Sequence, residues 1–294
     1  MRDAAHGESL DHEVYRTPYV VEPEYEQWDT PGNYHDRHLG PDKLPEKMKV
    51  WLVQDGRKVG GKIPGSVVAR AYGFTDSPDA EALALGFNTG KEYGAVGVGR
   101  HGNFLQWGYS LPPSQMTEAG RKFFLNCVCY IHRFDGKTPL VFRNSSHRLN
   151  AIRLARLINE IEDKKFFSHS FSDELMVKYE GDPEGLTEYY RDNLELVYRD
   201  RVYIVDAELR SLGLDSNRTL STLEQLIDLL DDRSHAKTAR QLLARYTDFR
   251  GEQFESADTW RSWLEKNKDR IFFSDVGGYK FFVVPEGYLD SGRR

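Results

Sequence analysis

Short apolar runs and alternating positions in the first half of the chain predict β-strands. The expected strands are residues 48–53 and 66–72, with 81–87 as a strand or a helix. Residues 95–100 and 103–109 flank His101 and Gly102, and this pattern predicts a tight hairpin because Gly102 can adopt a positive φ. Glycines at 94, 97, 99 and 108 indicate close backbone approach or bulges.

A helix is expected after this hairpin. Thr117 fits its N-cap. Phe124, Cys127, Val128 and Ile131 then follow the spacing of one buried helical stripe. Cys127 and Cys129 would point about 200° apart on such a helix, so we expect no disulfide between them. We expect both thiols to act as packing groups in an apolar interior.

The second half is predicted to be mainly helical, with a polar joint at residues 144–147. Asp182 with Pro183, the capping box Ser221–Glu224, and Ser234 are expected to begin helices. Further helical stripes cover residues 149–164 and 260–264. Residues 270–274 and 279–284 flank a glycine-containing turn and predict a second hairpin.

The N-terminal residues 1–47 combine five prolines with five tyrosine or tryptophan residues. Frequent prolines exclude long helices, and aromatic side chains favour burial. We therefore expect an extended arm on the folded body, with a short strand near residues 19–21, and a disordered tail at residues 1–12.

Together these patterns predict an α+β protein in three parts. The N-terminal half has a mixed sheet with a glycine-rich hairpin covered by a helix, and the C-terminal half is closed by a β-hairpin. The parts are the arm at 1–47, a partial α/β domain at 48–143, and a mainly helical domain at 144–294.

Charge and hydropathy narrow the classes of partner. The 294 residues include 40 Lys and Arg and 46 Asp and Glu, so the formal net charge is −6. A sequence-independent nucleic-acid binder needs a basic face, and we expect no nucleic acid here.

The longest nearly apolar stretch, residues 123–131, is less than half of a membrane span. The first eight residues lack the apolar centre of a secretory signal, which fits a cytoplasmic or a mature protein.

Carboxylates and histidines supply the candidate chemistry. Asp76 and Asp79, with His101 nearby, are candidates for acid–base catalysis, and capping of a turn is the alternative for both carboxylates. Arg100 and Asn103 at the hairpin tip are candidate ligand-binding residues, and so is Trp107.

Two weaker signals complete the candidate sites. His35 and His38 are weak metal candidates, because a metal site needs further ligands, and solvated loop histidines are the alternative. The glycine pattern at residues 97–102 lies within a hairpin and lacks the helix that would bind pyrophosphate. We expect no cofactor.

Residues 74–143 resemble a known group. Residues 74–81, 99–108, 116–118 and 124–131 are similar to a poorly characterised group of planctomycete-type secreted proteins. Their order is also similar to the closing part of trehalose-utilisation-type domains, which belong to the class I glutamine amidotransferase-like superfamily. The resemblance implies an α/β layer in the first half and a periplasmic or secreted location. The nucleophilic cysteine of that superfamily has no counterpart in this pattern.

Two functions follow as expectations. The first is a non-catalytic binding or assembly module of an extracytoplasmic system, because 13% of the residues are aromatic and no nucleophile motif is present. Its protein partner, or a second copy of the chain, would dock on the N-terminal arm and the C-terminal hairpin. The alternative is a carbohydrate-active, hydrolase-like enzyme using carboxylates near Asp76 and Asp79.

Overall fold

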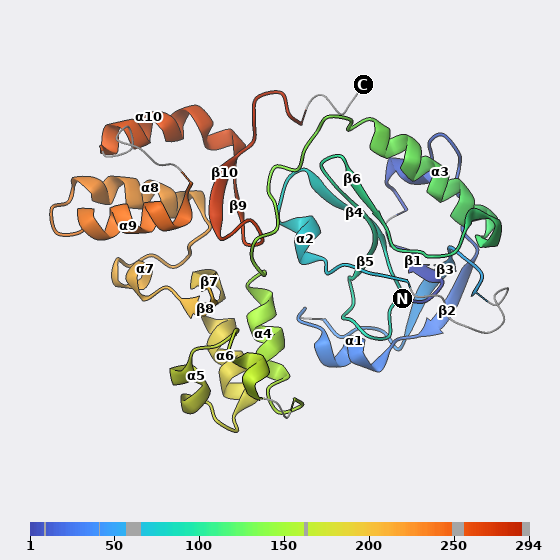
Figure 1. The fold of residues 1–294 in the computed structure, drawn as a ribbon, viewed down its shortest axis with the longest axis horizontal. Coiled ribbons are helices and arrows are strands. Elements are labelled where there is room, and N and C mark those ends of the chain that lie inside the picture. Colours follow the sequence, from blue (N-terminus) through green and yellow to red (C-terminus); the bar gives the residue numbers. More distant parts are fainter. Residues whose placement is uncertain (9, 41, 57–65, 162–163, 249–255, 290–294) are drawn as a thin grey trace. The chain divides into compact units, whose positions relative to one another are not determined.

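The computed structural model has α+β architecture, as predicted, and forms two compact units (Figure 1). It describes residues 1–8, 10–40, 42–56, 66–161, 164–248 and 256–289. The first unit comprises Met1–Leu140 and the C-terminal residues from Glu286 onward, and the second comprises Val141–Pro285. The chain therefore returns to its first unit after completing the second.

The first sheet of unit 1 has the strand order β1-β3-β2 and is antiparallel. Its strands are β1 (Ala4–His6), β2 (Tyr25–Asp29) and β3 (Lys47–Leu52). β1 pairs with β3, and all three of its residues are buried. The prediction of a disordered tail at residues 1–12 was wrong, because β1 completes a sheet edge. The short strand lies at β2 and not at residues 19–21.

The second sheet has the order β4-β5-β6 and contains the predicted hairpin. Its strands are β4 (Ala80–Leu85), β5 (Val96–His101) and β6 (Phe104–Trp107). Gly102 turns the hairpin with φ of 56°, which an L side chain rarely adopts. The strand expected at 66–72 was wrong: Ala69 makes an isolated bridge to Val96, and α2 (Tyr72–Thr75) follows.

Helix α3 (Glu118–His132) packs on the core of unit 1. The Gly120 N–H donates to Thr117 Oγ1 at 2.9 Å, which confirms the predicted N-cap. The predicted stripe was partly wrong. Val128 is 49% exposed, whereas Phe123, Asn126, Cys127 and Tyr130 face the interior. Some apolar side chains of α3, Val128 among them, therefore lie outside its buried face.

The arm is fixed to α3 by hydrogen bonds between the Asn126 side chain and the backbone of the arm. Asn126 Nδ2 donates to the carbonyls of Val14 and Tyr19, each at 2.7 Å, and its Oδ1 accepts the Tyr19 N–H at 2.9 Å. The Tyr15 hydroxyl donates to the Leu83 carbonyl at 2.9 Å, and its ring stacks on Phe123 with centroids 4.7 Å apart. This part of the arm belongs to the core and is not a free docking segment.

Two further short helices of the first unit are α1 (Gly32–Arg37) and the 3-10 turn at Glu13–Tyr15.

Unit 2 combines helices with two hairpins. Its helices are α4 (Leu149–Arg156), α5 (Asp173–Lys178), α6 (Pro183–Asp192), α7 (Ala207–Ser211), α8 (Leu220–Asp228), α9 (Ala236–Tyr246) and α10 (Ala257–Asn267). The hairpins are β7 (Val197–Asp200) with β8 (Val202–Val205), and the predicted β9 (Ile271–Ser274) with β10 (Lys280–Val283). Helices α8, α9 and α10 bury Leu226, Leu242 and Trp260 against Phe281 of β10.

Several predicted ends of these helices were wrong. α8 is capped by Thr219 and not by Ser221, and α9 begins after His235 and not after Ser234. α4 is also shorter than predicted and ends at Arg156, not at residue 164. α6 begins at Pro183 after the predicted cap Asp182 and ends at Asp192. Among the described helices, none combines the length and the apolar character needed to cross a membrane.

Candidate functional site

Asp79 lies in the turn before β4, where the protein itself occupies both of its oxygens. The side chain is 1% exposed. Oδ1 accepts the Ser77 hydroxyl at 2.5 Å and lies 3.4 Å from His101 Nε2. Oδ2 accepts the Leu140 N–H at 2.9 Å and the Tyr288 hydroxyl at 3.1 Å. The structure therefore brings Asp79 and His101 together, but within a closed set of partners.

The protonation of Asp79 does not suit a general acid. Burial opposes its ionisation, but the contacts with His101, Ser77 and the Leu140 N–H outweigh burial and lower the pKa of Asp79 to about 2. A general acid needs a pKa near the working pH. The carboxylate also lies between Ser77 and His101, so these two side chains converge on Asp79 and do not form a nucleophile–base pair.

Glu81, two residues further along, forms a second ionised cluster. Its Oε1 accepts Arg100 Nε and the Tyr130 hydroxyl, both at 2.5 Å, and Oε2 lies 3.3 Å from His12 Nε2. Burial again opposes ionisation, but these partners lower the pKa of Glu81 to about 2. Arg100 is 7% exposed, and its guanidinium lies 3.7 Å from the centroid of the Phe134 ring. Arg100 is thus held inside the fold and is not displayed at a hairpin tip.

The remaining candidate residues have different surroundings. Asp76 directly follows the last residue of α2, at the C-terminal end of that short helix. Trp107 is half-buried and contacts the rings of Phe123 and Phe124, at 5.7 and 5.0 Å between centroids. Asn103 is half-buried, and its N–H donates to the Lys137 carbonyl at 2.7 Å.

The two metal candidates, His35 and His38, lie at the end of α1. His35 is exposed and His38 is half-buried. Within the part of the chain that the structure describes, no three His, Cys, Asp or Glu side chains gather in a way that could hold a metal ion.

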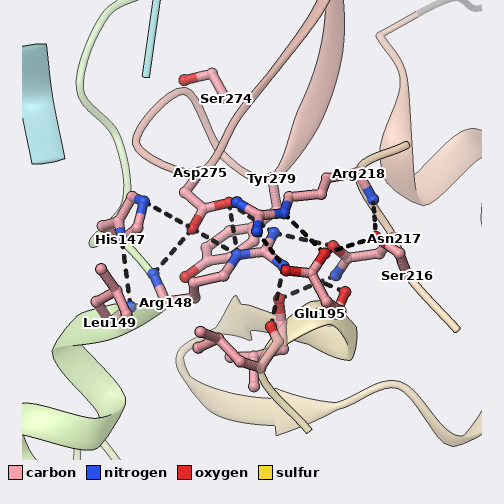
Figure 2. A network of polar contacts seen from close by, with 12 residues as sticks. His147, Arg148, Leu149, Glu195, Ser216, Asn217, Arg218, Ser274, Asp275 and Tyr279 are labelled. Carbon is pink, nitrogen blue, oxygen red and sulfur yellow. Dashed lines mark hydrogen bonds and ion pairs between the residues drawn. The ribbon is translucent and has the colours of Figure 1, made fainter. Parts of the chain in front are cut away.

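A second polar network fills the interior of unit 2 (Figure 2). Arg148, at the start of α4, and Asp275, after β9, are each at most 1% exposed. Arg148 Nε donates to Asp275 Oδ2 at 2.8 Å, and Nη2 donates to Oδ1 at 2.7 Å. The guanidinium also donates to Asn217 Oδ1 at 2.9 Å and to the carbonyls of Leu194 and Glu195. This bidentate pair ties α4, β9 and the segments around 195 and 217 together.

His147 completes this network without a free basic nitrogen. Its Nδ1 accepts the Leu149 N–H at 3.2 Å, which assigns the ring proton to Nε2, 3.5 Å from Asp275 Oδ2. Burial and the nearby Arg148 outweigh Asp275 and lower the pKa of His147 to about 4. Both ring nitrogens are engaged, so the arrangement is structural. The sequence showed only a polar joint here, because Asp275 is 127 residues distant from Arg148.

The outer face of α3 differs from both networks because its apolar side chains are solvent-exposed. Leu125 and Val128 are 46% and 49% exposed, and Cys129 is exposed beside them as a free thiol. Tyr19, whose backbone is bonded to Asn126, and its neighbour Val20 are 48% and 60% exposed. We call these five residues the α3 face. Sequence periodicity missed it, because Val128 and Cys129 were assigned to the interior. That assignment was wrong for Cys129 and right for Cys127, which is buried.

The comparisons with known proteins give no relative. No family model matches the chain, and neither a curated protein nor a solved structure matches it.

Proposed function

We propose that this protein is a non-catalytic binding module that pairs with a second copy of itself through the α3 face. The observation that carries this proposal is the exposure of Leu125 and Val128 on one helix whose opposite side already packs on a core. Large apolar side chains gathered on a surface mark interaction sites more often than isolated ones do. The extracytoplasmic setting of the module rests on the sequence resemblance alone.

The spacing of exposed residues on α3 favours a helical partner. Arg121, Leu125, Val128 and His132 are exposed on α3 and follow one another at intervals of four, three and four residues, and the exposed Asp135 lies in the turn directly after the helix. This is the heptad spacing with which one helix packs along another. Leu125 and Val128 form the apolar centre of the row, and the charged side chains lie at its ends.

Charge complementarity favours a second copy of the chain as the partner. The row begins with a cation, Arg121, and ends with an anion, Asp135. In an antiparallel pair, Arg121 of each copy lies beside Asp135 of the other, so two ion pairs form by symmetry. This register places Val128 next to the two-fold axis, as a closed isologous interface requires. Asp135 contacts His132 in the single chain at 2.7 Å, but both side chains are more than 70% exposed, so exchanging partners costs little.

The carbohydrate-hydrolase alternative receives less support from the geometry. Such enzymes need one carboxyl with a raised pKa as the acid. Asp79 and Glu81 both have their pKa lowered to about 2, and Asp79 is buried.

Sedimentation equilibrium over a range of protein concentrations tests the proposal. We expect wild type to shift from monomer to dimer as the concentration rises, and Val128→Glu to stay monomeric because a buried charge would lie at the two-fold axis. Val177→Glu is the matched control, since Val177 is 75% exposed in unit 2. It should dimerise like wild type.

Two results would contradict the proposed function. One is a wild-type protein that is monomeric at every concentration. The other is a dimer whose dissociation constant is the same for Val128→Glu and Val177→Glu, since the α3 face would then take no part in it.

A further inference from the structure

Unit 2 has a groove between helices α4 and α6 that neither polar network uses. Its volume is about 520 Å³, which is in the range of small-molecule sites. Arg156 contributes the last residue of α4, and the other lining residues come from α6: Pro183, Glu184, Thr187, Glu188 and Arg191. The two helices pack directly against each other, so the groove is built on rigid elements.

Two guanidinium groups face this groove from different helices. Arg156 and Arg191 line the same groove, and burial and the positive charge of Arg191 both lower the pKa of Arg156, as expected for neighbouring cations. Arg191 is exposed, and its side chain makes no hydrogen bond or ion pair within the described ranges. An anion placed between the two guanidiniums would relieve the repulsion and accept their planar N–H donors.

Thr187 supplies an independent sign that the groove is incomplete. Its side chain is 5% exposed, and its buried Oγ1 has no hydrogen-bond partner among the described residues. A threonine inside a helix can bond the carbonyl four residues before it, but this hydroxyl does not. Rotation about one side-chain bond exchanges the hydroxyl with the methyl group, so a ligand in the groove can give the hydroxyl a partner.

The two carboxylates of the groove limit the ligand further. Glu184 and Glu188 are exposed on the same helix and line the same hollow as the arginines. The arginines would attract a bare anion, but the glutamates would repel it. A ligand with an oxyanion at one end and an ammonium group at the other has a charge complementary to each pair.

We propose that the α4–α6 groove binds a small zwitterion, with its oxyanion on Arg156 and Arg191 and its ammonium group on Glu184 and Glu188. The Thr187 hydroxyl donates to the oxyanion. This site lies in unit 2 and does not depend on pairing through the α3 face.

Isothermal titration calorimetry of the full chain tests the site with three probes. Phosphoethanolamine carries both charges, inorganic phosphate carries only the oxyanion, and ethanolamine carries only the ammonium group. We expect saturable binding of phosphoethanolamine, weaker binding of inorganic phosphate, and no binding of ethanolamine. Arg191→Gln should weaken phosphoethanolamine about tenfold or more, because it removes a charge-assisted contact.

Two further variants separate a ligand site from a structural role. Arg240→Gln is the matched control, because Arg240 is exposed on α9 of the same unit and does not line the groove. It should change the dissociation constant less than twofold. Thr187→Val keeps the shape of the side chain, so it should weaken phosphoethanolamine while the melting temperature stays the same or rises.

The proposal is overturned if none of the three probes binds. It is also overturned if Arg191→Gln and Arg240→Gln lose affinity for phosphoethanolamine equally, because the positive charge of Arg191 in the groove would then play no special part in binding. Phosphate binding that exceeds phosphoethanolamine binding would contradict the role of the two glutamates.

Discussion

His6 makes the stability of unit 1 depend on pH. The side chain is 2% exposed on β1, among the rings of Tyr34, Phe87 and Tyr93, and burial lowers its pKa to about 4. In the unfolded chain it returns to the ordinary value of 6.5. Between these values the unfolded chain binds a proton that the folded chain does not. Stability is therefore intact above pH 6.5 and falls as the pH drops toward 4.

The size of this effect follows from the two pKa values. A tenfold difference in proton affinity corresponds to about 1.4 kcal/mol, so His6 lowers the free energy of unfolding by about 2 kcal/mol at pH 5 and about 3 kcal/mol at pH 4. Asp79 and Glu81 act in a lower range. Their pKa values of about 2 in the folded chain make their contribution disappear only as the pH falls below their ordinary values of 3.8 and 4.5.

The His6→Phe variant isolates this contribution. Phenylalanine fits the aromatic surroundings, and the Tyr34 hydroxyl keeps the Asn88 N–H as its donor at 2.9 Å. Urea titrations at pH 7 and pH 5, with unfolding monitored by hydrogen exchange on peptides of β1 and β3, measure the stability of unit 1 separately from that of unit 2. We expect His6→Phe to reduce the difference between the two pH values by about 2 kcal/mol relative to wild type.

The exposed His35 provides the control, and His35→Gln should keep the wild-type pH dependence. If His6→Phe loses as much stability between pH 7 and pH 5 as wild type does, burial of His6 is not the cause and the reasoning is refuted.

Three further predictions concern packing and charge. Arg148→Met should destabilise unit 2 by about 3–5 kcal/mol in urea, because the buried Asp275 carboxylate loses the guanidinium that balances its charge. Arg218→Met, which breaks the half-exposed contact with Glu195, should cost less than about 1 kcal/mol, and equal losses would contradict the structural role of the buried pair. Gly120→Ala should lower the melting temperature, because the added Cβ would lie 1.8 Å from the Val53 carbonyl oxygen. Gly73→Ala should leave it unchanged, because no atom lies within 4 Å of the Cβ added there. Similar melting temperatures for the two variants would show that α3 does not pack as described. Ellman's reagent should react with Cys129 in dilute native protein but with Cys127 only after unfolding. The reason is that Cys127 is buried and burial raises the pKa of its thiol. Reaction of both thiols in the native protein would contradict this packing.

Local sequence signals predicted the elements that local interactions determine. The β5–β6 hairpin depends on positive φ at Gly102, and the start of α3 depends on the hydroxyl of Thr117. Both signals lie within a few residues of the structure that they specify. The α10 stripe and the β9–β10 hairpin were found for the same reason.

Elements that depend on distant partners were missed. β1 is a strand because Ala5 pairs with Trp51, and no pattern within residues 1–12 contains that information. Asn126 interrupts an apolar run, but it is buried because it binds the backbone of the arm more than a hundred residues earlier. That contact fixes which side of α3 faces inward, so periodicity alone placed Val128 in the core. The same limit hid the Arg148–Asp275 pair.

Disulfide trapping along α3 reports directly on antiparallel pairing through the α3 face. In a Cys127→Ala/Cys129→Ser background, we expect Val128→Cys to form a covalent dimer on mild oxidation, because residue 128 lies at the two-fold axis. A mixture of the Arg121→Cys and Asp135→Cys chains should form the mixed dimer in preference to either like pair. Val177→Cys, exposed in the second unit, should remain monomeric. Equal trapping at residues 128 and 177, or no trapping at residue 128, would contradict antiparallel pairing through the α3 face.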